Sequence, residues 1–232
     1  MENRVYVVAT LKPWNIQAYH RTLKHLPGQW HLVTDPAQLT VERVRSLAPR
    51  YIFFPHWSEI VPAEILALTE CVCFHETDLP FGRGGSPVQN LIERGQRETV
   101  ITALRMVEEL DAGPVYMKQP LSLEGGGEEV YLRAASLVAE MIAEMIEQEP
   151  ESFEQVGEAV VFQRRTPQQS EVPSDMQGLE QLFDHIRMLD AEGYPKACFT
   201  HGHYRFELSR PALKTGEIVA DVRITRIEDE AR

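Results

Sequence analysis

Apolar runs and amphipathic segments alternate along the first 75 residues. Short runs rich in β-branched and aromatic residues read as buried strands, and they cover residues 4–10, 30–34, 51–54 and 71–75. The segments between them carry apolar residues at helical spacing, and they cover residues 14–26, 40–48 and 62–69. This alternation predicts an α/β domain whose mainly parallel sheet carries helices on both faces.

The pattern changes after Gly95. Residues 98–123 form two extended runs broken by Asp-Ala-Gly-Pro, which is typical of a hairpin, and residues 125–148 form a long amphipathic helix. From residue 151 a strand-like run, a polar linker, a helix and three alternating strands follow. We therefore expect a first domain over residues 1–150 and a small α+β region over 151–232.

The composition is that of a globular protein without disulfides. Of the 232 residues, 43% are hydrophobic and 25% charged, and the three cysteines are too few for a disulfide framework. The apolar run near the N-terminus is too short for a signal sequence, and no later stretch approaches a membrane span. A cytoplasmic location without a membrane partner is expected.

The net charge of −12, from 35 acidic and 23 basic residues, indicates which partners to expect. Such a field repels the phosphates of long nucleic acids, although a local basic patch can still hold one small phosphorylated ligand. The sequence therefore predicts no nucleic-acid partner.

Cys71, Cys73 and His75 alternate along one predicted strand, so their side chains share one face. A structural zinc site needs four ligands, and no second cysteine or histidine pair at ligand spacing is present. Buried, apolar cysteines explain the pattern better, and no metal is expected. The GRGG stretch at residues 82–85 matches no nucleotide-binding motif, although a helix starting near Ser86 would present N–H groups to an anion.

His75 ends its predicted strand, where open α/β sheets place their ligands, and Asp111 lies on a sharp turn in the same half of the chain. A carboxylate beside an imidazole can fix its tautomer and support proton transfer. A buried structural histidine is the alternative for His75 taken alone. The carboxylates Glu76 and Asp78, which follow it directly, are of secondary interest.

Two segments resemble the formyltransferase family that uses 10-formyltetrahydrofolate: FHETDLPFGRGGSPVQNLIERG and ETVITALRMVEELDAGPVY. The family includes methionyl-tRNA formyltransferase and the nucleotide-sugar N-formyltransferases, and the chain looks most like the latter. The family motif joins Asn-x-His-x-x-x-Leu-Pro, an Arg-Gly loop and Asp-x-Gly. It is matched here by His75, Leu79, Pro80, Arg83, Gly84, Pro87, Asp111 and Gly113. The resemblance implies a Rossmann-like catalytic domain with a mainly parallel sheet, followed by the small α+β appendage.

By this resemblance, His75 and Asp111 are the catalytic pair. His75 would stabilise an oxyanion or relay protons, while Asp111 would orient His75 and help to take the amine's proton. Cys73 stands where the family has asparagine, and a thiol is a weak hydrogen-bond donor. Three alternatives follow: Cys73 acts weakly, Asn90 supplies an amide instead, or the protein is a degraded relative.

The resemblance also implies 10-formyltetrahydrofolate as cosubstrate. The implied cosubstrate contacts are Trp57, Ser58, Ile60, Leu110 and Gly113, and the implied acceptor contacts are Lys12, Asn15, Arg83, Gly84 and Ser86. A homodimer is implied as well.

Features of the sequence disfavour two of the acceptors that the family uses. A glycine-rich phosphate loop after the first strand is absent, which disfavours glycinamide ribonucleotide. The negative charge and short C-terminal part disfavour methionyl-tRNA. A nucleotide-linked amino sugar, such as a 4-amino-4,6-dideoxy sugar for a surface glycan, is therefore expected. The alternatives are a non-catalytic binding relative and a methionyl-tRNA formyltransferase-like enzyme with another amine acceptor.

Overall fold

The computed structural model describes residues 4–227, which form two compact units. Unit 1 comprises the described parts of Met1–Gly84, Thr99–Leu121 and Tyr131–Phe162. Unit 2 comprises the described parts of Gly85–Glu98, Ser122–Val130 and Gln163–Arg232. The units are thus assembled from interleaved segments, whereas the boundary expected at residue 150 divides the chain once. That boundary stays a prediction.

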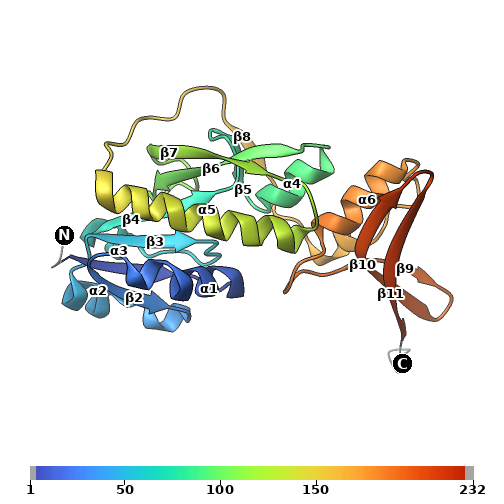
Figure 1. Ribbon diagram of the computed structural model, residues 1–232, viewed down its shortest axis with the longest axis horizontal. Coiled ribbons are helices and arrows are strands. Elements are labelled where there is room, and N and C mark those ends of the chain that lie inside the picture. Colours follow the sequence, from blue (N-terminus) through green and yellow to red (C-terminus); the bar gives the residue numbers. More distant parts are fainter. Residues whose placement is uncertain (1–3, 228–232) are drawn as a thin grey trace. The chain divides into compact units, whose positions relative to one another are not determined.

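A six-stranded sheet organises the first part of the chain (Figure 1). Its order is β2-β1-β3-β4-β6-β7, with bounds Gln29–Val33, Val5–Ala9, Tyr51–Pro55, Glu70–His75, Glu98–Arg105 and Val115–Ser122. The first four strands are parallel, and β6 runs antiparallel to β4. The expected α/β fold with a mainly parallel sheet is confirmed.

Three helices connect the first four of these strands and a fourth follows β7, where the sequence predicts them. They are α1 (Pro13–Arg21), α2 (Val41–Leu47), α3 (Ala63–Leu68) and α5 (Gly127–Gln148), with short 3-10 turns at Leu23–His25 and Pro36–Gln38. Local chemistry explains the helix starts: α1 has proline at its first position, and Thr40 Oγ1 accepts the N–H of Arg43 at 3.2 Å to cap α2. Within residues 4–227, no helix combines the length and apolarity that a membrane span requires.

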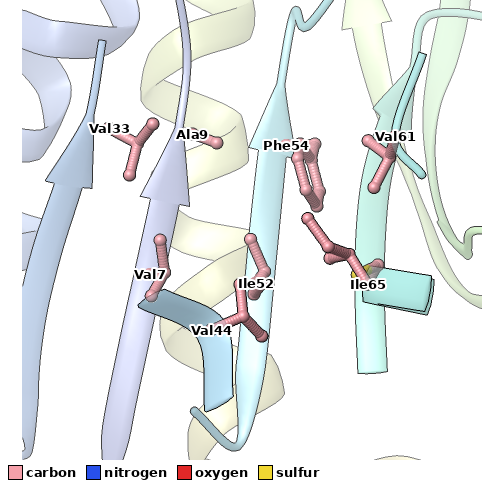
Figure 2. Packing of buried hydrophobic residues seen from close by; sticks show 9 residues of the cluster. Val7, Ala9, Val33, Val44, Ile52, Phe54, Val61 and Ile65 are labelled. Carbon is pink, nitrogen blue, oxygen red and sulfur yellow. The ribbon is translucent and has the colours of Figure 1, made fainter. Parts of the chain in front are cut away.

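The core on one face of the sheet follows from the two-residue period of the strands (Figure 2). Alternate residues of β1 and β3 meet side chains from α2 and α3; the labelled members are Val7, Ala9, Val33, Val44, Ile52, Phe54, Val61 and Ile65. The intervening residues of the same strands, including Tyr6, Val8 and Phe53, are also buried. Both faces of the sheet are therefore covered, as the continuous apolar runs predict.

A short parallel pair, β5 (Phe81–Gly84) with β8 (Val160–Phe162), was not anticipated in full. The sequence predicts β8 as a strand but reads residues 82–85 as a turn. At Gly84 the backbone has φ of +101°, and a Cβ there would lie 2.5 Å from the carbonyl oxygen of Phe162. Glycine at this position thus allows the two strands to approach closely.

Unit 2 contains α4 (Pro87–Glu93), a 3-10 turn (Pro167–Ser170), α6 (Leu179–Met188) and an antiparallel sheet. The sheet has the order β11-β10-β9, with bounds Glu217–Arg226, Tyr204–Lys214 and Ala197–His201. The fully buried Arg187 bonds Asp184 at 2.6 Å and the carbonyl oxygens of Leu123 and Gly125 at 2.5 and 2.9 Å. This arginine therefore fastens α6 to the segment before α5. The α+β character expected of the C-terminal part is confirmed.

Candidate active site

The imidazole of His75 is held at the carboxyl end of β4. The residue is buried, and its Nε2 lies 2.7 Å from the carbonyl oxygen of Gly82. Because a carbonyl oxygen only accepts, Nε2 must carry the hydrogen of this bond. The other ring nitrogen, Nδ1, faces the Oδ2 atom of Asp111 at 3.6 Å.

Asp111 is fixed from its own side. It lies in the loop between β6 and β7 with φ of +53°, a left-handed conformation that aspartate tolerates better than most residues. Its Oδ2 accepts the backbone N–H of Gly84 at 2.9 Å. The structure thus brings together the two residues that the sequence pairs, and it occupies the Gly84 amide that was expected to contact substrate.

A glutamine that the sequence analysis missed holds the Asp111 loop. Gln155 Nε2 donates to the carbonyl oxygens of Asp111 and Gly113, each at 2.8 Å, while its Oε1 accepts from Arg83 at 2.8 and 3.2 Å. Arg83 also bonds Glu109 at 3.2 Å. Arg83, an expected acceptor contact, therefore helps to hold the loop through Gln155. No sequence motif around Gln155 predicts that it bonds this loop.

Gly113 is required by the same loop. A Cβ at this position would lie 1.8 Å from the carbonyl oxygen of Arg105, so no other residue fits without moving the backbone. The sequence analysis expects Gly113 to contact the cosubstrate; the structure supplies a packing reason for glycine.

Cys73 lies two residues before His75 on the same strand face. It packs against Leu79, Leu104 and Val115. Burial raises the pKa of the Cys73 thiol well above its usual value, and the nearby charge of Asp111 raises that pKa further. The thiol therefore stays protonated and offers only a weak donor.

Two family models match the chain. The model described as formyl transferase covers residues 20–143, and the model described as methionyl-tRNA formyltransferase, C-terminal domain, covers residues 167–225. The chain belongs to the formyl transferase family.

Three relatives show how this formyl transferase compares with known proteins. A solved structure named methionyl-tRNA formyltransferase from Clostridium thermocellum is 46% identical, covers 96% of this chain and 99% of its own, and has a TM-score of 0.93. Methionyl-tRNA formyltransferase of Thermotoga maritima is 32% identical over 111 residues, which are 46% of this chain and 36% of that protein. A sugar N-formyltransferase structure from a Shewanella species is 12% identical, covers 99% of each chain and has a TM-score of 0.65.

These values correct one expectation. The chain was expected to resemble the nucleotide-sugar N-formyltransferases most, yet its identity to the Clostridium protein is far higher than to the Shewanella sugar enzyme. Net charge and tail length, on which the acceptor was judged, do not measure relatedness. The matches to the curated Thermotoga proteins span only about a third of their length.

A second ionisable pair lies in unit 1 of the formyl transferase. The Glu76 side chain is 12% exposed, and its Oε1 lies 4.0 Å from Nδ1 of His56. Burial raises the pKa of Glu76; His75 and the residue's own backbone N–H act against this, and Asp111 adds to it. Asp78, the neighbouring carboxylate, instead bonds Lys118 at 2.6 Å on the surface.

The expected folate contacts follow β3 and flank Asp111. Trp57 packs edge-on against Phe54 with ring centroids 5.7 Å apart, and its buried Nε1 has no hydrogen-bond acceptor among residues 4–227. Ser58 is exposed, and the apolar side chains of Ile60 and Leu110 are 96% and 69% exposed. The cosubstrate role of these residues stays a prediction.

The expected acceptor contacts near α1 have structural partners. Asn15 is buried and donates from Nδ2 to the carbonyl oxygen of Pro55 at 3.2 Å, which ties α1 to the end of β3. Lys12 Nζ lies 5.6 Å from the ring centroid of Trp14. The Asn15 amide is therefore already hydrogen-bonded within the protein, and the acceptor contacts of Asn15 and Lys12 stay predictions.

Ser86 and Asn90 belong to unit 2. Ser86 Oγ accepts the backbone N–H of Arg165 at 3.1 Å. Asn90 Nδ2 lies 3.0 Å from the carbonyl oxygens of Gly85, Ser86 and Gln163, so its two hydrogens already serve three acceptors. This arrangement gives Asn90 a structural role, and its part as a substitute donor stays a prediction.

Across residues 4–227, no three histidines, cysteines or carboxylates are placed to hold one ion.

Proposed function

We propose that this formyl transferase moves the formyl group of 10-formyltetrahydrofolate to a primary amine. The observation that supports this most is the His75–Asp111 pair, held at the carboxyl end of a parallel strand by Gly82 and Gly84. Open α/β sheets bind their ligands at this edge. The donor and the acceptor would therefore meet beside a buried imidazole and a carboxylate.

The reaction requires one proton to move from nitrogen to nitrogen. The acceptor amine attacks the formyl carbon, a tetrahedral oxyanion forms, and the bond from that carbon to N10 of the folate breaks. The amine loses a proton and N10 gains one. Nδ1 of His75 is the ring nitrogen available for this relay, because Nε2 donates to Gly82.

The 3.6 Å separation between Nδ1 of His75 and Oδ2 of Asp111 is longer than a hydrogen bond. The two atoms are therefore not hydrogen-bonded to each other, and an amine proton can be transferred to either of them. In this role Asp111 orients the imidazole and stabilises its charged form, while His75 stabilises the developing oxyanion or passes the proton on.

The cosubstrate would bind at the loops after β3 and around Asp111. Trp57 Nε1 supplies an unpaired donor, and Ile60 and Leu110 supply apolar surface that the ligand would cover. Ser58 and Gly113 complete the proposed set. Cys73 contributes shape here more than hydrogen bonding, since its thiol stays protonated.

The first acceptor to test is the α-amine of methionyl-tRNA. The Clostridium structure with that name matches almost the whole of both chains at 46% identity, and the C-terminal family model carries the same name. A second acceptor is favoured by the net charge of −12, which suits a small molecule: a nucleotide-linked 4-amino sugar contacted by Lys12, Arg83 or Ser86. A homodimer through the C-terminal region belongs to the same proposal.

The test supplies 10-formyltetrahydrofolate together with methionyl-tRNA, or with UDP- or dTDP-linked 4-amino sugars, and looks for a product heavier by one formyl group. A formylated product with either acceptor is expected, and His75→Asn should abolish it. Folate binding without any product would show a non-catalytic binding protein. Full activity in His75→Asn would overturn the assignment of the site.

A further inference from the structure

Glu76 and His56 form an ionisable pair for which the proposed relay has no use. They follow the last residues of two neighbouring parallel strands, His75 of β4 and Pro55 of β3. Glu76 Oε1 and His56 Nδ1 are 4.0 Å apart. The backbone of His56 has φ of +50°, which is uncommon for a residue other than glycine, so the surrounding structure must hold it in this conformation.

Two stacked aromatic rings pack against the His56 imidazole. The rings of Trp14 and Tyr131 stack at 4.9 Å and 3°, and both meet the His56 imidazole edge-on, at 5.6 and 4.9 Å. The side chains of His56 and Glu76 are 20% and 12% exposed, whereas Trp14 and Tyr131 are buried. The two ionisable side chains are therefore largely enclosed but keep some contact with solvent.

The groups that act on the Glu76 carboxylate come from several elements. His75 lies before it on β4, His56 follows β3, and Asp111 lies in the loop between β6 and β7. Thr99 on β6 bonds only the Glu76 backbone, with its hydroxyl donating to the carbonyl oxygen at 3.2 Å. The balance of these contacts raises the pKa of Glu76, chiefly through burial. A carboxylate of this kind is a better proton acceptor than an exposed one.

We propose that Glu76, positioned by His56, accepts the first proton of the acceptor amine, which reaches the site as an ammonium ion. This inference rests on the proposed formyl transfer. An ammonium nitrogen has no lone pair and cannot attack a formyl carbon. The Glu76 carboxylate takes one proton and becomes a carboxylic acid, and the neutral amine is left bound. The acid returns that proton to solvent through His56.

Two different protons explain why two carboxylates are present. Asp111 already accepts the Gly84 N–H and faces His75, so it serves the second proton, which the amine loses during attack and N10 gains. Glu76 accepts the first proton, before the bond between the amine nitrogen and the formyl carbon forms. Net charge is conserved in each step.

The distinguishing experiment is the pH dependence of kcat/KM for Glu76→Gln, with 10-formyltetrahydrofolate saturating and the concentration of an amine acceptor that the wild type formylates varied. An α-amine with a pKa of about 7.7–8.0 is mostly protonated at pH 7, so the variant should lose about tenfold or more there. By about pH 9 the amine is neutral without help, and the variant should approach wild type. Asp78→Asn, which removes an exposed carboxylate two residues away, is the matched control and should follow wild type at every pH.

A Glu76→Gln profile identical to wild type, or one lowered equally at all pH values, would overturn the assignment. His56→Asn places at this position another residue that tolerates a left-handed backbone. Like Glu76→Gln, it should lower kcat/KM on the acid side of the pH profile, but by a smaller factor. A kcat/KM profile of His56→Asn that matches wild type on the acid side would overturn the positioning role of His56. A wild-type protein that formylates no amine would overturn the proposed function and this inference together, whereas an active enzyme with an unchanged Glu76→Gln variant overturns the inference alone.

Discussion

Oδ2 of Asp111 lies 3.6 Å from Nδ1 of His75 and accepts the backbone N–H of Gly84 at 2.9 Å. One carboxylate oxygen thus connects three segments: the end of β4, the short strand β5 and the loop before β7. The carboxylate is oriented by the Gly84 amide, and its charge is directed at the imidazole.

Asp111→Asn tests that charge. The asparagine oxygen can still accept the Gly84 N–H, so the fold should survive, but a neutral amide no longer supports a charged imidazole. We expect kcat to fall by about 10²–10⁴-fold with a thermal midpoint close to wild type. Glu109→Gln, in the same loop with an exposed side chain, is the control and should stay active. A variant that keeps more than about a tenth of the wild-type rate would argue against an essential Asp111.

The three cysteines should resist alkylation in the folded protein. Burial raises the pKa of Cys71 to about 12, and burial likewise raises the pKa of Cys73 and of Cys198. Little thiolate is therefore present at pH 8, and the thiolate is the reactive form. Intact mass after iodoacetamide treatment should show an unmodified native protein and three additions in denaturant. Early modification of Cys73 would show an accessible, activated thiol instead.

Asn90→Ala should cost stability more than chemistry. The substitution removes the side-chain donor to the carbonyl oxygens of Gly85, Ser86 and Gln163, and within residues 4–227 only that of Ser86 keeps a donor, the backbone N–H of residue 90. We expect this loss to cost about 2–3 kcal/mol in urea unfolding. The rate per folded molecule should be unchanged. Gln96→Ala, at an exposed site nearby, is the control for stability. Lost activity at full stability would support Asn90 as the substitute for the family asparagine.

Gly113→Ala should unfold the Asp111 loop. The added Cβ would meet the carbonyl oxygen of Arg105 at 1.8 Å, and relieving that contact requires backbone movement, for which we expect about 3 kcal/mol of destabilisation. Gly126→Ala is the matched control, because its nearest neighbour would be a Glu129 oxygen at 3.7 Å. Equal stability of the two variants would show that the loop adapts without strain.

Glu76→Gln should stabilise the protein in a pH-dependent way. Burial raises the pKa of Glu76 in the folded state, so its favourable contribution is full below the unfolded-state pKa and is lost as pH rises through the folded-state pKa. Glutamine stays neutral throughout. Thermal unfolding should therefore show a higher midpoint for the variant at pH 8 and little difference at pH 4. A constant difference at both pH values would indicate a packing effect instead.

Much of this protein can be predicted from local pattern. The apolar runs of β1, β3 and β4 are buried on both faces and therefore lack alternation, which identifies a parallel sheet before any coordinate is known. The position of His75 at the end of β4 follows from the same pattern, and its pairing with Asp111 follows from the family motif. Helix starts such as Thr40 are readable because capping is a short-range interaction.

The remaining features depend on contacts between residues far apart in the chain. β5 is a strand only because β8, about 80 residues later, pairs with it, and a glycine-rich tetrapeptide carries no sign of that partner. Gln155 holds the Asp111 loop through backbone carbonyls, which have no signature in sequence.

The surroundings of the acidic residues were decided in the same way. Glu76 and Asp78 look alike in the sequence, yet one is enclosed beside His56 and the other bonds Lys118 on the surface. Sequence by itself determined the sheet, the helices and the catalytic candidates, because periodicity and motifs are local. Only the tertiary structure decided which of those side chains are buried, paired or exposed, since burial and electrostatic environment are set by the segments that pack around each residue.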